Sequence, residues 1–201
     1  MNPDTLDIQS CREHQMIPDT VRKQLRLSKL GQIGYVVTDI DRTITYCKDA
    51  FGMSPWILLD ERPDPCIQQG EVIHPLLRIA LAYAGPVQIE LVQVIEGDTF
   101  HLRHTRELEG KIHHLGFMVQ DVDKRLYDYE HMGIGVLQRG TIRDAGLTVD
   151  YACLDTIDQT GVILELIQWR LGPLPFPTNR MVFNLVCLAG SWTVLKGRVI
   201  R

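Results

Sequence analysis

Residues 31–42 read Gly-Gln-Ile-Gly-Tyr-Val-Val-Thr-Asp-Ile-Asp-Arg, and residues 113–124 read His-His-Leu-Gly-Phe-Met-Val-Gln-Asp-Val-Asp-Lys. Aligned at an offset of 82 residues (114 minus 32), the two stretches share a glycine, a valine and both aspartates. A second pair follows in the same order, Ile-Glu-Leu-Val-Gln at 89–93 and Leu-Glu-Leu-Ile-Gln at 164–168. Two matched pairs in one order indicate that the chain contains an internal repeat.

Each copy of the repeat predicts the same order of helices and strands. The apolar segments 33–37 and 115–119 are predicted strands. Each is followed by an aspartate suited to cap a helix and later by a glycine suited to end it; these residues are Asp39, Gly52, Asp121 and Gly133. Three further strands are expected in each copy, at 55–60, 75–84 and 87–95 and at 135–139, 148–154 and 161–169. The chain is therefore predicted to be an α+β protein with two βαβββ modules.

The repeat also sets the expected domain boundaries. We assign residues 30–100 to the first module and 111–170 to the second. Residues 1–29 form an N-terminal extension, and a short cap helix is possible within 18–30. Residues 171–201 form a tail whose early prolines do not suit a central strand. The sequence leaves open whether this tail packs on a neighbouring subunit or is unstructured.

Composition excludes several classes of partner. The chain has 201 residues, of which 45% are hydrophobic, and a net charge of -4, so it lacks a basic excess that would attract nucleic acid or an anionic membrane. Its five cysteines form no CxxC pair, which argues against a disulfide framework and a thiolate zinc site. Neither a signal peptide nor an apolar run of about 20 residues is evident. We therefore expect a cytoplasmic protein that binds neither nucleic acid nor membrane.

Four polar residues occupy equivalent places in the two copies. Gln32 aligns with His114, and Glu90 aligns with Glu165. Burying a carboxylate among apolar strand residues costs several kcal/mol unless it is paired or bound to a metal. If a pseudo-twofold axis relates the modules, all four side chains converge on one point. The alternatives are a hydrogen-bonded strand glutamine at Gln32, a hydrogen-bonded core histidine at His114, and buried ion pairs of the two glutamates with Arg78 or Lys111.

These motifs resemble those of the vicinal-oxygen-chelate superfamily, which includes glyoxalase I, methylmalonyl-CoA epimerase, extradiol dioxygenases and bleomycin-resistance proteins. The resemblance covers residues 30–170 and is nearest to methylmalonyl-CoA epimerase or glyoxalase I. It implies a cupped, barrel-like mixed β-sheet around one metal ion, often in a homodimer, with His114 rather than His113 as ligand. The chain departs from both enzymes: Gln32 replaces a usual epimerase histidine, and Val36 and Val94 replace residues that hold glutathione in glyoxalase I.

The expected donor set is one imidazole, two carboxylates and one amide oxygen, which suits Mn, Co, Ni, Zn or Mg. A divalent ion of this kind is a Lewis acid that can hold a small-molecule substrate by two adjacent oxygens. It would stabilise the enediolate formed when a proton leaves the carbon next to a carbonyl. We expect Glu165 to be the base, with Glu90 as the second candidate. The resulting activity would be that of an isomerase, an epimerase or a lyase.

Three further residues are expected on strands that line the cup and are candidates for substrate binding. They are Trp56, Arg78 and Tyr151, and Arg78 could meet an anionic substrate. Two other functions remain open. One is an extradiol ring-cleaving dioxygenase, although such enzymes use two histidines and one glutamate for iron(II). The other is a metal-free protein that binds a small molecule, as resistance proteins do.

Overall fold

The computed structural model of the chain describes residues 27, 29–103, 111–144, 146–188 and 197–201. The cap helix expected within residues 18–30 falls almost wholly outside these ranges, and Leu30 begins the first strand. Among the described residues, no helix is both long and apolar enough to cross a bilayer.

The two halves of the chain repeat one βαβββ order, as predicted. In the first half the main elements are β1 (Leu30–Val36), α2 (Ile40–Phe51), β2 (Trp56–Glu61), β5 (Leu76–Ala84) and β6 (Val87–Glu96). In the second half they are β7 (His114–Met118), α5 (Val122–Glu130), β8 (Val136–Asp144), β9 (Leu147–Leu154) and β10 (Ile163–Leu171). The shorter elements are β3 (Cys66–Gln68), β4 (Glu71–Val72), α3 (Phe100–Arg103), α6 (Ile157–Thr160), β11 (Leu174–Pro175), α7 (Arg180–Leu188) and β12 (Arg198–Ile200).

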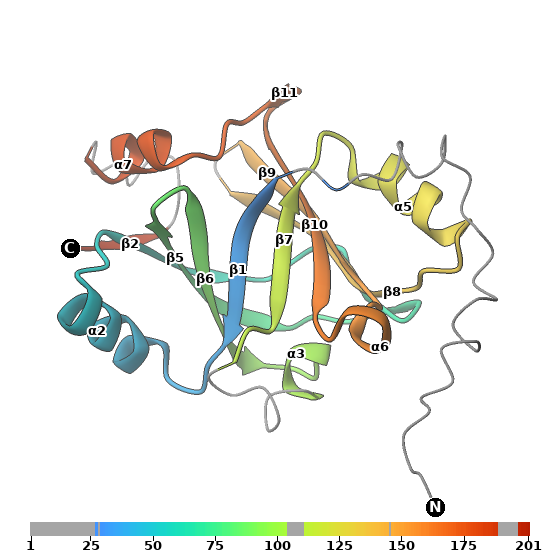
Figure 1. The fold of residues 1–201 in the computed structure, drawn as a ribbon, viewed down its shortest axis with the longest axis horizontal. Coiled ribbons are helices and arrows are strands. Elements are labelled where there is room, and N and C mark those ends of the chain that lie inside the picture. Colours follow the sequence, from blue (N-terminus) through green and yellow to red (C-terminus); the bar gives the residue numbers. More distant parts are fainter. Residues whose placement is uncertain (1–26, 28, 104–110, 145, 189–196) are drawn as a thin grey trace, which may run out of the picture.

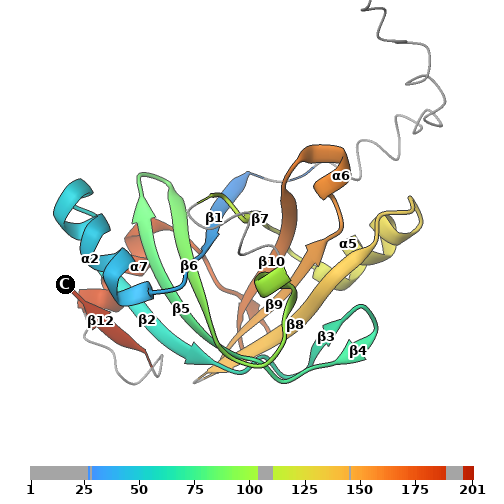
Figure 2. The ribbon, with the colours of Figure 1, turned by 90° about the horizontal axis from the view of Figure 1, so that it is seen from below.

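All the described strands belong to one sheet that curls into a cup (Figure 2). Its order is β12-β2-β5-β6-β1-β7-β10-β9-β8-β3-β4, with β11 paired to β10. The two halves meet where β1 pairs with β7 in antiparallel fashion, and each of these strands pairs in parallel with the last strand of its own half. The centre of the sheet therefore has approximate twofold symmetry (Figure 1).

Helices α2 and α5 begin where the sequence predicts and pack on the convex face of the sheet. The side chains of Asp39 and Asp121 each accept a 2.9 Å hydrogen bond from a backbone N–H three residues later. Helix α2 ends at Gly52, which has a φ of 63°. Helix α5 ends two residues earlier than expected, because His131 rather than Gly133 caps it.

The hairpin β3–β4 was not predicted. It lies between β2 and β5 in the sequence, but β3 pairs with β8 of the second half. The Thr141 backbone N–H donates to Pro65 (3.0 Å), and the Asp64 N–H donates to the Thr141 carbonyl (2.8 Å). The linker from β2 thus carries the chain from one side of the cup to the other.

The C-terminal tail packs on its own first half. On α7, Phe183 and Cys187 are buried in the apolar cluster formed by β2, β5 and β6. Strand β12 then pairs with β2, with Val199 opposite Ile57. Figure 1 shows α7 across one end of the cup. The described part of the tail is therefore ordered and needs no neighbouring subunit for these contacts.

Candidate metal centre

The register between β1 and β7 places a polar side chain opposite a glycine twice. Gln32 on β1 faces Gly116 on β7, and Gly34 on β1 faces His114 on β7. Because side chains two residues apart share a face of a strand, all four positions point to the same side of the sheet. This side is the concave one, where both polar residues line a cavity.

The parallel neighbours add one carboxylate to each row. Glu90 on β6 pairs with Gly34, and Glu165 on β10 pairs with Gly116. Each glycine therefore lies between a glutamate from its own half and a polar ligand candidate from the other half. Four strands deliver four polar side chains to the centre of the cup, as the repeat predicts.

The two glycines are required because the polar side chains lie directly over them. A Cβ atom on Gly34 would lie 1.9 Å from Nε2 of His114. A Cβ atom on Gly116 would lie 2.9 Å from Cβ and 3.0 Å from Oε1 of Gln32. The glycine conserved between the two copies of the repeat therefore makes room for the polar group of the opposite half.

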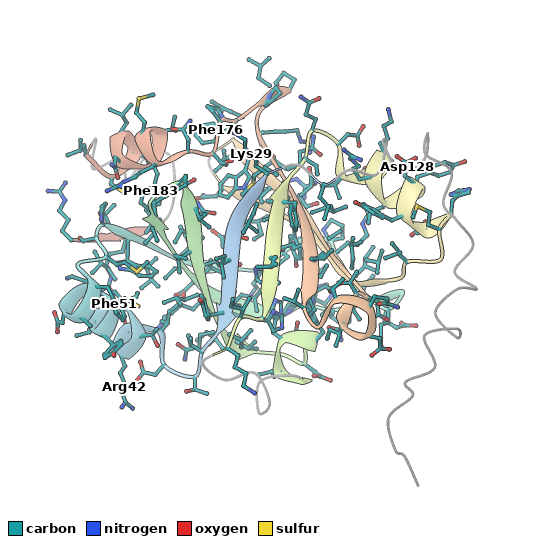
Figure 3. The ribbon with its side chains drawn as sticks, in the orientation of Figure 1. Lys29, Arg42, Phe51, Asp128, Phe176 and Phe183 are labelled. Atoms are coloured by element: carbon teal, nitrogen blue, oxygen red, sulfur yellow. The ribbon has the colours of Figure 1, made fainter. Side chains whose placement is uncertain are left out.

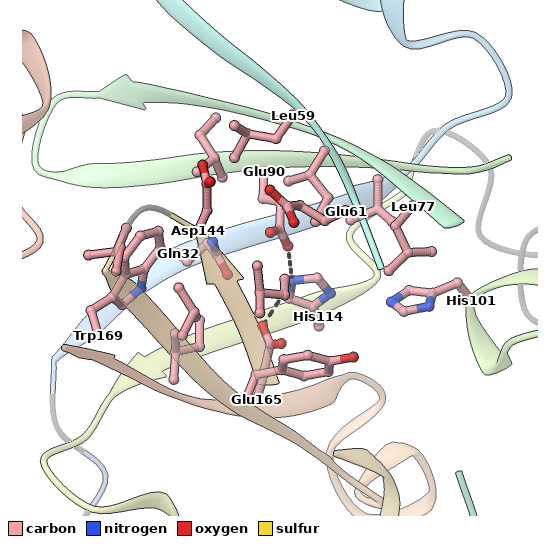
Figure 4. Close-up of a pocket in the computed structure, with 18 residues that line it drawn as sticks. Gln32, Leu59, Glu61, Leu77, Glu90, His101, His114, Asp144, Glu165 and Trp169 are labelled. Carbon is pink, nitrogen blue, oxygen red and sulfur yellow. Dashed lines mark ion pairs between the residues drawn. The ribbon is translucent and has the colours of Figure 1, made fainter. Parts of the chain in front are cut away.

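Three of the four side chains form a compact cluster (Figure 4). Nε2 of His114 lies 3.0 Å from Oε2 of Glu90 and 3.3 Å from Oε2 of Glu165. One donor atom from each of the three residues lies within 4.8 Å of the others, as in a group that can hold a metal ion. Gln32 lines the same cavity.

Three polar side-chain atoms at this site lack hydrogen-bond partners, whereas the second polar atom of the Gln32 and of the His114 side chain has one. Oε1 of Gln32, Nε2 of His114 and Oε2 of Glu165 are buried and complete no hydrogen bond, although Nε2 is within ion-pair distance of both carboxylates. By contrast, Nε2 of Gln32 donates to Oε1 of Gln88 at 2.9 Å. Since an unsatisfied buried polar atom costs about 1–3 kcal/mol, three such atoms on residues that line one cavity fit a site for a cation.

A second histidine fixes the orientation of His114. Nδ1 of His113 lies 3.1 Å from Nδ1 of His114, so one nitrogen donates and the other accepts. If Nε2 of His114 uses its lone pair for a metal ion, Nδ1 carries the proton and donates it to His113. The His113 ring stacks on His101 at a centroid distance of 5.3 Å.

Burial dominates the electrostatics of the cluster. It raises the pKa of Glu165 to about 7, with the neighbouring Glu90 adding to the rise and His114 opposing it. Burial alone would lower the pKa of His114, but the two carboxylates reverse this effect and the net direction is upward. A cation at the cluster would favour the ionised carboxylate and the neutral imidazole instead.

The cluster opens into a cavity of about 80 Å³, and Tyr151 lines it, as expected. The Tyr151 hydroxyl donates to Oε1 of Gln138 at 3.2 Å. His101 also lines the cavity; burial lowers its pKa to about 3, so its ring is neutral. His101 was not predicted to be a site residue, because it lies between the two copies of the repeat.

Trp56 and Arg78 do not line this cavity, contrary to expectation. Trp56 packs beneath α2 on the convex face, and its indole N–H donates to the Met53 carbonyl at 2.7 Å. Arg78 forms a two-pronged ion pair with Asp60, at 2.7 and 3.0 Å, and so does not neutralise Glu90. The other proposed cation, Lys111, is exposed.

Comparison with known proteins agrees with this geometry. The sequence model of the Glyoxalase/Bleomycin resistance protein/Dioxygenase superfamily matches residues 31–153. The chain belongs to this superfamily. The match includes Gln32, Glu90 and His114 and ends before Glu165. No curated protein matches the chain by sequence.

Two solved structures have a similar fold. The methylmalonyl-CoA epimerase from Mycobacterium tuberculosis is 22% identical, with a TM-score of 0.52 over 75% of this chain and 90% of the epimerase. A hypothetical protein from Bacillus halodurans C-125 is 21% identical, with a TM-score of 0.50 over 69% of this chain and 92% of that protein. The cupped fold expected from the resemblance is confirmed.

Proposed function

We propose that the chain is a metal-dependent isomerase, epimerase or lyase that removes a proton from a carbon next to a carbonyl. Gln32, Glu90, His114 and Glu165 would hold one divalent ion. The observation that carries this proposal is the compact cluster of Glu90, His114 and Glu165, which lines one cavity together with Gln32, whose buried Oε1 has no hydrogen-bond partner.

The donor set suits the proposed cofactor. Oxygen ligands with a single imidazole are compatible with Mn, Co, Ni, Zn or Mg. Bound there, such an ion would supply Lewis acidity toward two adjacent oxygens of a small-molecule substrate. The cluster has one histidine and two carboxylates, whereas iron(II) ring-cleaving enzymes use two histidines and one carboxylate. The unpartnered atoms likewise favour a metal enzyme over a metal-free binding protein.

Glu165 is proposed as the base. Its carboxylate lines the cavity, where it can meet a substrate proton, and Oε2 has no hydrogen-bond partner. Apolar walls around it keep water away, so the carboxylate is poorly solvated and readily accepts a proton. Glu90 is the second candidate and lies on the other side of His114 (Figure 4). From the family resemblance, we also propose that the active form is a homodimer.

Two measurements test this function. Purified protein should contain, or bind on titration with Mn or Co, one equivalent of metal, and the metal should raise its melting temperature. The metal-loaded protein should then catalyse solvent-deuterium exchange on at least one member of a panel of 2-oxo acids, acyl-CoAs and hemithioacetals. Stoichiometric metal binding without exchange on any compound would contradict the proposed reaction, and failure to bind metal would favour a metal-free binding protein.

A further inference from the structure

The indole of Trp169 carries a buried polar group that a cation cannot satisfy. Trp169 lines the metal cavity, and its N–H has no hydrogen-bond partner among the described residues. A metal ion can bind the lone pairs of Gln32, His114 and Glu165, but an N–H group needs an acceptor. Because an unsatisfied buried donor costs about 1–3 kcal/mol, this group is suited to meet an oxygen atom of a ligand.

Trp56 provides a comparison, because its indole N–H is satisfied. It lies on the convex face, and its N–H donates to the Met53 carbonyl at 2.7 Å. Buried indole N–H groups usually have such a partner. The unpartnered N–H of Trp169 therefore needs an explanation, and its place in the candidate site supplies one.

The position of Trp169 on β10 determines which part of a ligand it can meet. It follows Glu165 by four residues, so at about 3.3 Å per residue their Cα atoms are about 13 Å apart. Both side chains line the cavity. Figure 4 shows Trp169 and His101 at opposite ends of the lining residues, with the indole nitrogen on the side of its ring that faces Gln32. The N–H therefore faces a ligand atom several bonds away from the metal cluster.

Neighbouring elements hold Trp169 in place. Its backbone pairs with Val149 on β9. The backbone N–H of Phe176, on the segment between β11 and α7 (Figure 3), donates to the Trp169 carbonyl at 2.8 Å. The indole also borders a small cavity under α7, and Leu81 and Leu147 lie with it between the two cavities. A donor held in this way loses little conformational freedom on binding and can orient a ligand.

We propose that Trp169 binds the substrate, and that its indole N–H donates a hydrogen bond to a third oxygen of the substrate, besides the two that chelate the metal. This inference rests on the proposed function, because it places the chelating oxygens at the metal cluster. The substrate then has a chelating pair of oxygens and, on an arm that points along β10, a further acceptor oxygen. The hydrogen bond orients the reacting carbon relative to Glu165.

Paired hydroxamates test this inference, because a hydroxamate chelates divalent metals through two adjacent oxygens. The two arms of a pair have equal length, and one ends in a methyl ketone whereas the other ends in the corresponding alkyl group. Each compound would be titrated into the full-length, Zn-loaded protein while the indole N–H signals are followed by NMR. At one arm length, the ketone should move the Trp169 indole proton further downfield than its alkyl partner does. The signal of Trp56, whose N–H is already bonded, should stay in place.

The variant W169F removes the N–H group and keeps an aromatic ring. The ratio of the two dissociation constants of a pair, measured by calorimetric titration, should change by roughly threefold to tenfold in the direction that disfavours the ketone. W56F is the matched control on the convex face and should leave this ratio unchanged. An unchanged ratio in W169F, or no additional downfield shift at any arm length, would overturn the inference. The wild-type NMR titration decides this even if W169F does not fold.

Acetohydroxamate separates the inference from the proposed function. It has almost no arm, so its binding to the Zn-loaded protein reports on chelation alone. If it binds and no ketone moves the Trp169 signal beyond its alkyl partner, the metal site stands and the third oxygen is wrong. If neither acetohydroxamate nor any paired compound binds the metal-loaded protein, the proposed function and the inference both fail.

Discussion

The two halves of the molecule deliver their side chains through one backbone arrangement but use them differently. Gln32 and His114 hold equivalent places on β1 and β7, and each lies over a glycine of the other strand. In the first half, Gln88 on the neighbouring strand holds the amide nitrogen of Gln32. In the second half, His113 from the adjacent position holds the imidazole.

This difference shows that symmetry sets where the groups lie, and that local contacts set what each can do. The amide of Gln32 can offer a neutral oxygen, whereas the imidazole of His114 can change its charge. The carboxylates also differ, because Oε2 of Glu165 is fully buried and has no hydrogen-bond partner. We therefore expect the second half to carry more of the metal affinity and the proton transfer, and the first half to complete the site.

Substitutions of the two glutamates should show the largest difference between the two halves. E165Q should lower the rate of solvent-deuterium exchange by about 10²–10⁴-fold at saturating metal, because it removes the base. E90Q should mainly weaken metal binding, so that excess metal restores much of its rate. Exchange rates and metal dissociation constants of both variants would be measured side by side. An equal or larger loss of exchange in E90Q at saturating metal would reverse the assignment.

The two glycines should differ in sensitivity. The methyl group of G34A would lie 1.9 Å from the place that Nε2 of His114 occupies in the wild-type protein, so the imidazole must move. We therefore expect metal affinity to fall by about a hundredfold or more. The Cβ atom of G116A would lie 2.7 Å from Cδ1 of Ile167 and 2.9 Å from Cβ of Gln32, and this variant should lose less affinity. G135A is the control, since its nearest contact would be 3.6 Å, and calorimetric titration should give wild-type affinity. Unchanged affinity in G34A would show that His114 is not a ligand.

The residues that orient the ligands should have smaller effects. H113L removes the acceptor for Nδ1 of His114 and should weaken metal binding about 10–100-fold, whereas H113N keeps an acceptor and should recover most of it. Q88L makes the matching change in the first half and should cost less. H131L, at an exposed histidine, is the control. The visible spectrum of the Co-loaded variants would detect altered ligand orientation, and an unaltered spectrum and affinity in H113L would contradict this role.

The smallest effect concerns the pH dependence of the metal-free protein. Folding raises the pKa of Glu165 from 4.5 to about 7, so between these values the folded chain holds a proton that the unfolded chain has released. His114, whose pKa is also raised, acts in the same direction. The free energy of unfolding should therefore fall, on the order of 2 kcal/mol, as pH rises from 5 to 8. Urea unfolding of E165Q should show a shallower fall; an equally steep one would exclude Glu165 as the cause.

The sequence was sufficient to predict the two repeated modules and the equivalent positions of the four polar side chains. Both follow from local patterns: an apolar strand, an aspartate that caps a helix, and a glutamate among apolar residues. The repeat then supplied the long-range pairing, because equivalent strands of two similar modules pair at a pseudo-twofold axis. It did not predict β3–β4 or α7, which have no counterpart in the other half.

The errors at Trp56 and Arg78 have a physical reason. Strand β2 is buried on both faces from Trp56 to Leu59, so its pattern of apolar residues does not reveal which side chains face the cup. Arg78 alternates with the inward-facing Leu77 and Ile79 and pairs across the strands with Asp60. A cross-strand ion pair of this kind depends on register, which the sequence of one strand does not contain.

Anomalous diffraction from crystals soaked in Mn²⁺ would test the four proposed ligands, because it locates the ion without reference to activity. We expect one strong peak per chain in the cup, bonded to Nε2 of His114 and to side-chain oxygens of Gln32, Glu90 and Glu165. The absence of a peak among these four residues after soaking, or a strongest peak elsewhere, would show that they do not form the metal site.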